Sequence, residues 1–167
     1  MQVENSSLFL PWYNFNLIEY LNSYLKSNMV IFEYGIGFSS LFYAQKNCNV
    51  YGIETRIEWL ERVQSLAKKH NLEGKIAISH CQDIPNFHKS LLNFNIDFDV
   101  IVIDSIQRLA CLEIAKQKYQ KGLIVLDNSE RPNLKEAKNI MHGFNFLEFE
   151  GKRPNDDKTS SALVFFK

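Results

Sequence analysis

Two carboxylates and two glycines in the first third of the chain have the types and spacing of a ligand-binding turn. Glu33 lies at the end of an apolar run and is followed by Gly35 and Gly37, and a second apolar run ends in Glu54. Glycines after a strand let the backbone approach a ligand closely, and the helix that follows begins with free N–H groups. This arrangement is typical of the first half of a nucleotide-binding α/β domain.

The residues around this turn do not favour a dinucleotide. The dinucleotide fingerprint requires a third glycine for close helix packing, and Ser40 stands at that position. Glu33 also stands where a pyrophosphate would meet a carboxylate. A cationic ligand fits this place better, and Glu54 is placed to accept two hydrogen bonds from a ribose diol. S-adenosylmethionine combines a sulfonium group, an ammonium group and such a diol.

The ordered motifs between about residues 29 and 131 resemble those of the class I S-adenosylmethionine-dependent methyltransferases. These motifs are Glu33-x-Gly35-x-Gly37-x-Ser39, Glu54, the run 99–104 and the run 122–131. The resemblance is greatest to small bacterial members that carry an Asp-Asn-Ser-Glu-Arg run after the fifth strand. This chain departs from that group at Ser105, where glycine is more frequent.

The patterns predict an α/β fold, a Rossmann-like seven-stranded and mostly parallel sheet with helices on both faces and a C-terminal antiparallel hairpin. Strands are predicted at 29–34, 49–54, 76–80, 98–103 and 123–126, and hairpin strands at 144–149 and 162–166. Helices are predicted at 15–26, 39–46, 56–69, 83–94, 107–118 and 132–143. The family resemblance implies the strand order 3-2-1-4-5-7-6.

The length of 167 residues predicts one methyltransferase-like domain over 1–167. Residues 1–28 are expected to form an N-terminal aromatic and helical cap, and residues 29–167 the Rossmann-like core. The cap is too short for a separate acceptor domain. Its aromatic residues either cover the active site or simply cover the sheet: Phe9, Trp12, Tyr13, Phe15, Tyr20 and Tyr24.

Charge, hydropathy and cysteine content limit the partners and the compartment. Lysine plus arginine equals aspartate plus glutamate at 19 each, so no basic excess favours nucleic acid as a partner. No apolar run approaches the roughly 20 residues that cross a bilayer, so we expect a cytoplasmic protein that does not bind membranes. Cys48, Cys81 and Cys111 have no paired spacing and are predicted to be buried thiols.

Seven residues are the candidates for the cofactor site: Glu33, Gly35, Gly37, Ser39, Glu54, Asp83 and Asp104. The glycines are alternatively ordinary turn residues, and Glu54 is alternatively a surface acid that pairs with Arg56. The resemblance implies that Asp83 contacts the adenine amino group, whereas its position before Pro85 equally predicts a helix N-cap.

Asp104 is the candidate catalytic residue, because the resemblance implies that the fourth strand ends beside the methyl group. Methyl transfer from a sulfonium is an in-line displacement in which charge is neutralised, so alignment supplies much of the catalysis. A base is required only when the acceptor must lose a proton. Asp104 therefore accepts such a proton, holds the methionine ammonium group, or only caps the turn into the next helix.

A magnesium site is an alternative at the ends of the fourth and fifth strands. Asp104, Asp127 and Asn128 supply three oxygen ligands there, an arrangement similar to that of cation-dependent catechol-type O-methyltransferases. The run from Asp127 to Pro132 also fits a turn and a helix cap, in which case no metal is bound. Arg108 and Arg131 either pair with these acids or bind an anionic acceptor.

The sequence thus predicts an S-adenosylmethionine-dependent methyltransferase that acts on oxygen of a small-molecule acceptor. The Asn-Pro-Pro-Tyr motif of amino-group methyltransferases is absent after the fourth strand. Two alternatives stay open: a methyltransferase-like binding domain without catalysis, and a nicotinamide-dependent oxidoreductase, which Ser40 and Glu33 disfavour. A homo-oligomer in which a second subunit completes the acceptor pocket is also compatible with the short N-terminal cap.

Overall fold

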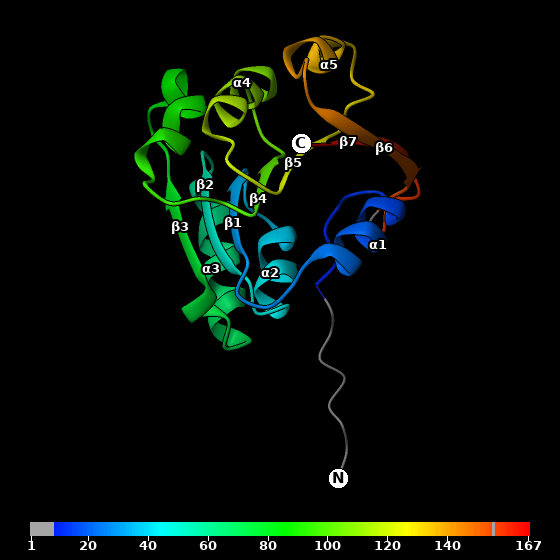
Figure 1. Ribbon diagram of the computed structural model, residues 1–167. Coiled ribbons are helices and arrows are strands. Elements are labelled where there is room, and N and C mark those ends of the chain that lie inside the picture. Colours follow the sequence, from blue (N-terminus) through cyan, green and yellow to red (C-terminus); the bar gives the residue numbers. More distant parts are fainter. Residues whose placement is uncertain (1–8, 155) are drawn as a thin grey trace.

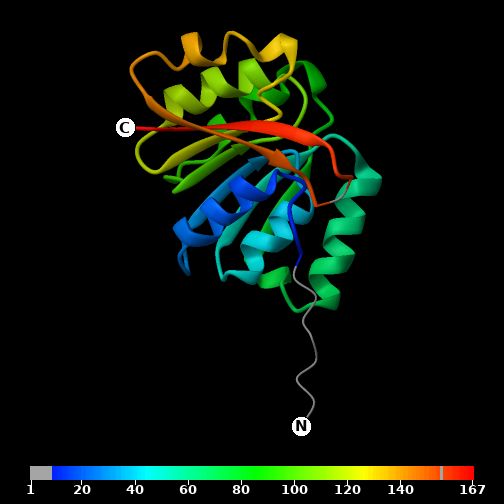
Figure 2. The same ribbon diagram turned by 90° about the vertical axis from the view of Figure 1, so that its right-hand side faces the viewer.

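The computed structural model describes residues 9–154 and 156–167. These residues form a seven-stranded sheet with helices on both faces (Figures 1 and 2). The strand order is β3-β2-β1-β4-β5-β7-β6. The first five of these strands are parallel, and β7 is antiparallel to both β5 and β6. The predicted fold class and strand order are confirmed.

The strands are β1 (Val30–Tyr34), β2 (Asn49–Glu54), β3 (Ile76–His80), β4 (Val100–Ile103), β5 (Leu123–Asp127), β6 (Asn145–Lys152) and β7 (Thr159–Phe166). The α-helices are α1 (Phe15–Tyr24), α2 (Phe38–Gln45), α3 (Ile57–Lys69), α4 (Arg108–Lys118) and α5 (Ala137–Ile140). Three 3₁₀ helices complete the described elements: η1 (Glu73–Lys75), η2 (Ile84–Asn93) and η3 (Pro132–Leu134).

Three segments differ from the prediction. The segment predicted as a helix at 83–94 is the 3₁₀ helix η2, in which Phe87 and Leu91 are buried against the core. The helix predicted at 132–143 is divided into η3 and the short α5. Both hairpin strands are longer than expected, because the added residues at 150–152 and 159–161 include no large apolar side chain and give little hydrophobic signal.

The two faces of the sheet have separate apolar cores because successive side chains of a strand point to opposite faces. Phe32 and Tyr34 of β1 pack in the cluster that includes residues of α4, α5 and η2. Ile31 packs in the cluster that includes residues of α1 and α2. Glu33 therefore lies on the same face as Ile31, beneath α1 and α2.

No helix among the described residues has the length and apolarity needed to span a bilayer. The cysteines agree with the predicted burial at two of the three positions. All three cysteines are free, and Cys48 and Cys111 are buried as predicted. Cys81 is partly exposed, which corrects the expectation of burial, because it directly follows the edge strand β3.

Candidate active site

A cavity lies beyond the carboxyl ends of β1, β2, β4 and β5. Its lining residues are Trp12, Gly35, Ile36, Gly37, Phe38, Ser39, Glu54, Arg56, Trp59, Asp104, Arg108, Asp127, Asn128, Arg131 and Arg153. The strand order reverses between β1 and β4, and open parallel sheets bind ligands at such a reversal. The structure brings five of the seven predicted cofactor residues to this cavity, and Glu33 and Asp83 are not among its lining residues.

The turn after β1 passes very close to the end of β4. Gly35 has a φ of +82°, and a Cβ atom at this position would lie 2.2 Å from the carbonyl oxygen of Asp104. Gly37 is different, since the nearest atom to a Cβ there would be Trp59 Nε1 at an ordinary 3.5 Å. Gly35 is therefore required by the fold, whereas Gly37 leaves the backbone open toward the cavity.

We expect the substitution Gly35→Ala to reduce the free energy of unfolding by about 2 kcal/mol, because it combines an unfavourable positive φ with overpacking against β4. Urea denaturation of the two proteins measures this difference. Gly74→Ala is the matched control, because no atom lies within 4 Å of a Cβ there. Equal effects of the two substitutions would contradict the close approach at Gly35.

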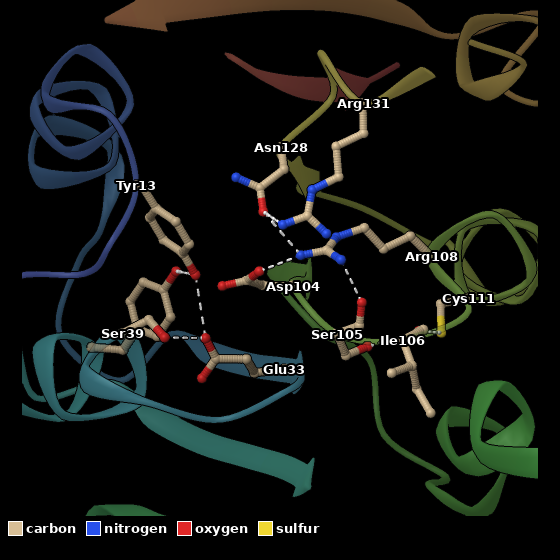
Figure 3. Close-up of polar contacts among 11 residues, drawn as sticks. Tyr13, Glu33, Ser39, Asp104, Ser105, Ile106, Arg108, Cys111, Asn128 and Arg131 are labelled. Carbon is tan, nitrogen blue, oxygen red and sulfur yellow. Dashed lines mark hydrogen bonds and ion pairs between the residues drawn. The ribbon is translucent and has the colours of Figure 1, made fainter. Parts of the chain in front are cut away.

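Glu33 is fully buried and joins three elements. Its carboxylate accepts hydrogen bonds from the Tyr13 hydroxyl at 3.2 Å and from the hydroxyls of Ser39 and Ser40 at the start of α2. Tyr43 donates in turn to the Tyr13 hydroxyl at 3.1 Å. Figure 3 shows the Tyr13 and Ser39 side chains directed at this carboxylate.

Burial raises the pKa of Glu33 to about 7, although the serine hydroxyls partly oppose this shift. The carboxylate was expected to contact the cofactor at the mouth of the turn. The structure instead places it behind the turn, where it fixes the first residues of α2 against β1. The alternation along β1, which puts Glu33 on the face of Ile31, is the signal in the sequence that indicates this position.

Glu54 ends β2 and lines the cavity with only 6 % of its surface exposed. Its Oε1 atom accepts the backbone N–H groups of Thr55 at 2.8 Å and Arg56 at 2.9 Å. The Arg56 Nε atom lies 3.6 Å from the same oxygen, but the Arg56 side chain is 69 % exposed. The local bonds of Glu54 among the described residues thus engage Oε1, and Oε2 is the oxygen with acceptor capacity for a ligand.

Asp104 is held by Arg108 at the end of β4. The Arg108 Nη2 atom lies 2.6 Å from Asp104 Oδ1 and donates to Asn128 Oδ1 at 3.1 Å. Its Nη1 atom donates to the carbonyl oxygen of Ser105 at 2.5 Å. Figure 3 shows the guanidinium group placed between these acceptors. The ion pair leaves Asp104 Oδ2 to interact with a bound molecule.

The proposed magnesium ligands lie near one another, but their arrangement does not fit a divalent cation. The Arg108 guanidinium already supplies positive charge to Asp104 and Asn128, two of the three residues. Asp127 is buried, and burial together with the nearby Asp104 raises the pKa of its carboxyl group. Among the residues that the structure describes, no group of three histidine, cysteine, aspartate or glutamate side chains is arranged to hold a metal ion.

Asp83 lies outside the cavity. It is the N-cap of η2, and its side chain accepts the backbone N–H of Asn86 at 3.4 Å. This geometry supports the helix-cap alternative that the sequence left open. The contact with adenine has no support from the position of Asp83 in the structure.

Aromatic side chains form another part of the cavity wall: Trp12, Phe38 and Trp59. The ring centroids of Trp12 and Trp59 lie 5.7 Å apart, and Trp59 Nε1 donates to the carbonyl oxygen of Ile36 at 2.5 Å. The N-terminal segment thus contributes Trp12 to the cavity and buries Tyr13 beneath it.

Sequence reasoning did not single out Trp59 and Arg153. Trp59 was detectable, since it lies in the first turn of the helix that follows Glu54. Arg153 lines the cavity from the segment between β6 and β7. No sequence pattern places this segment near the ends of β1, β2, β4 and β5.

This chain resembles known proteins in structure but not detectably in sequence. No family model and no curated protein matches the sequence. The O-methyltransferase TomG from Streptomyces achromogenes, solved in complex with S-adenosylmethionine, is 14 % identical with a TM-score of 0.71, over 88 % of this chain and 77 % of that one. An O-methyltransferase from Bacillus cereus, in complex with S-adenosylhomocysteine, is 16 % identical with a TM-score of 0.66, over 83 % and 74 %.

A third solved structure shows that the fold extends to another named activity. The precorrin 8w decarboxylase of Methanobacterium thermoautotrophicum is 21 % identical with a TM-score of 0.69, over 90 % of this chain and 87 % of that one. The chain therefore has the Rossmann-like fold that these three solved structures share. The fold alone does not define the reaction, because one fold serves several chemistries, and the residues of the site decide which one takes place.

Proposed function

We propose that this protein is an S-adenosylmethionine-dependent methyltransferase that methylates oxygen of a small-molecule acceptor. The observation that carries the proposal is the convergence of Glu54, the Gly35–Gly37 turn and Asp104 on one cavity at the reversal of the strand order. The cofactor complexes of TomG and of the Bacillus cereus enzyme support the choice of ligand.

The residues of the cavity fit this cofactor by charge and by hydrogen-bonding capacity. Glu54 Oε2 is suited to accept from a ribose diol, and carboxylate acceptors form strong hydrogen bonds. Gly37 and Ser39 present the backbone at the start of α2, where no Cβ at position 37 obstructs a ligand. Arg108 offsets the charge of Asp104, so Glu54 is the carboxylate whose charge suits the cationic cofactor.

When bound, S-adenosylmethionine supplies an activated methyl group and a thioether leaving group. With the cofactor in place, an acceptor oxygen would form a bond to the methyl carbon as the carbon–sulfur bond breaks, and Asp104 would take the hydroxyl proton. Arg108 fixes the Asp104 carboxylate through its Oδ1 atom, so that Oδ2 is positioned to take this proton. Most of the acceleration then comes from alignment of the two reactants in the cavity.

We expect Asp104→Asn to reduce the rate of methyl transfer at least ten-fold while the affinity for S-adenosylmethionine stays within about three-fold. Transfer of radiolabelled methyl from S-adenosylmethionine to small molecules of a cell extract measures the rate, and calorimetry measures the affinity. Asp97→Asn is the matched control, because Asp97 is exposed and precedes β4, at the end of the strand away from the cavity.

The two measurements separate the roles that Asp104 was predicted to have. A parallel loss of cofactor affinity would show that Asp104 holds the ammonium group and does not act as the base. Unchanged rate and affinity would contradict both roles. Absence of any transfer by the unsubstituted protein, in extracts from several sources, would contradict the proposed function itself.

A further inference from the structure

Arginine is unusually frequent around the cavity. Four arginine side chains line it: Arg56, Arg108, Arg131 and Arg153. Three of them have a carboxylate within ion-pair distance: Glu54 for Arg56, Asp104 for Arg108 and Asp156 for Arg153. No carboxylate of the described residues lies within that distance of Arg131. One cationic group in the wall therefore has no counter-charge from the part of the chain that the structure describes.

Arg131 lies beside Arg108, so this positive charge is concentrated. The Nη2 atoms of the two side chains donate to the same oxygen, Asn128 Oδ1, at 2.8 Å for Arg131 and 3.1 Å for Arg108. Figure 3 shows the two guanidinium groups next to each other above the Asp104 carboxylate. Asp104 is the one carboxylate ion-paired with these two guanidinium groups among the described residues, and like charges this close repel each other.

The Arg108 and Arg131 side chains also have N–H donors that no acceptor among the described residues engages. The Arg108 Nε atom is buried, and no acceptor among the described residues bonds to it. Arg131 donates through Nη2, and no side-chain bond engages its remaining N–H groups within the described structure. The neighbouring Glu130 carboxylate accepts the backbone N–H of Ser161 at 2.8 Å and, among the described residues, makes no ion pair with Arg131. The buried Arg108 Nε donor without a partner, beside the exposed Arg131 guanidinium that has no counter-charge among the described residues, favours an anionic ligand.

We propose that Arg131, together with Arg108, binds a carboxylate or phosphate group of the methyl acceptor. The inference rests on the proposed function and adds a substrate class to it, small hydroxylated anions. The planar fork of a guanidinium group matches the oxygens of both anions.

The order of the strands supports this assignment. Glu54 ends β2 on one side of the cavity, Asp104 follows β4, and Asp127, Asn128 and Arg131 lie at or after the end of β5 on the other side. The Glu54 side thus suits the cationic cofactor. The side of Arg108 and Arg131 suits an anionic acceptor, because burial raises the pKa of Asp127 and disfavours its charged form. Asp104 lies between them, where the proton must be taken.

Tryptophan fluorescence gives a direct test, because the chain has two tryptophans and both Trp12 and Trp59 line the cavity. The probes are benzoate, inorganic phosphate and, as the uncharged analogue of benzoate, benzamide. Each is titrated into the protein alone and into the protein saturated with S-adenosylhomocysteine. The variants are Arg131→Gln and the control Lys135→Gln, which removes an exposed charge outside the cavity.

We expect benzoate or phosphate to bind the unsubstituted protein and Lys135→Gln equally, and to bind Arg131→Gln about ten-fold more weakly. Benzamide is expected not to bind detectably. Equal affinity of Arg131→Gln for the anions, or no saturable response from either anion, would overturn the proposal.

The same variants distinguish the acceptor from the carboxylate of the cofactor itself. If Arg131 binds the acceptor, the affinity of Arg131→Gln for S-adenosylmethionine is unchanged. A ten-fold loss of that affinity, with unchanged anion binding, would assign Arg131 to the cofactor and overturn the acceptor site. Failure of the proposed function is seen separately, as absence of S-adenosylmethionine binding to the unsubstituted protein.

Discussion

The substitution Glu33→Gln is expected to remove a fall of about 3 kcal/mol in the stability of the folded protein between acidic and mildly alkaline pH. Burial raises the pKa of Glu33 from 4.5 to about 7, so the folded protein binds this proton more tightly than the unfolded chain does. The resulting stability is fully present below about pH 4.5 and is lost as the pH rises through about 7. Glutamine keeps the size of the side chain but has no such proton.

Urea denaturation at several pH values from 4.5 to 8 tests this prediction. The difference in unfolding free energy between the unsubstituted protein and Glu33→Gln isolates Glu33, because Asp127, whose pKa is also raised by burial, is present in both. Glu19→Gln is the control, since Glu19 is exposed on α1. Equal pH dependence of all three proteins would contradict the buried, protonatable carboxylate beneath α2.

The substitution Glu54→Ala is expected to weaken S-adenosylmethionine binding about 100-fold. The carboxylate is assigned two hydrogen bonds to the ribose diol, and bonds to a charged group contribute about 1.5 kcal/mol each or more. Isothermal titration calorimetry of the variant and the unsubstituted protein measures the loss. Because Glu54 Oε1 also accepts two backbone N–H groups, circular dichroism has to show that the variant is folded.

Two further variants make the Glu54 result specific. Glu54→Gln keeps one carbonyl acceptor, and we expect it to bind with an affinity between that of Glu54→Ala and that of the unsubstituted protein. Glu58→Ala removes the same charge from an exposed position on α3 outside the cavity and should bind normally. If Glu58→Ala and Glu54→Ala weaken binding equally, the effect is one of net charge and the diol contact is wrong.

The strand order followed from the family resemblance, and most elements followed from the sequence because local signals agree with the global fold. Apolar runs that end in acids, glycine turns and amphipathic periods occur in the order that the architecture requires. The differences fall where tertiary packing decides. The segment around Phe87 is a 3₁₀ helix, which no local pattern separates from an α-helix, and β6 is a polar edge strand.

The site was predictable where a residue follows directly from a strand end, as for Gly35, Glu54 and Asp104. The position of Glu33 beneath α2 was indicated by the alternation along β1, but its hydrogen bonds to Tyr13 and to the start of α2 were not. Contacts between distant segments were also hidden, above all the shared Asn128 acceptor that brings Arg108 and Arg131 together. Spacing along the chain shows that such residues exist but not which of them meet.

Calorimetric titration of the unsubstituted protein with S-adenosylmethionine, S-adenosylhomocysteine and NAD tests the central claim most directly. We expect saturable binding of the first two, with affinities in the micromolar range, and no binding of NAD. Binding of NAD alone would assign the cavity to a nicotinamide cofactor, and Glu54 would then hold a different ribose. Absence of binding by all three ligands would contradict the assignment of this cavity as a cofactor site.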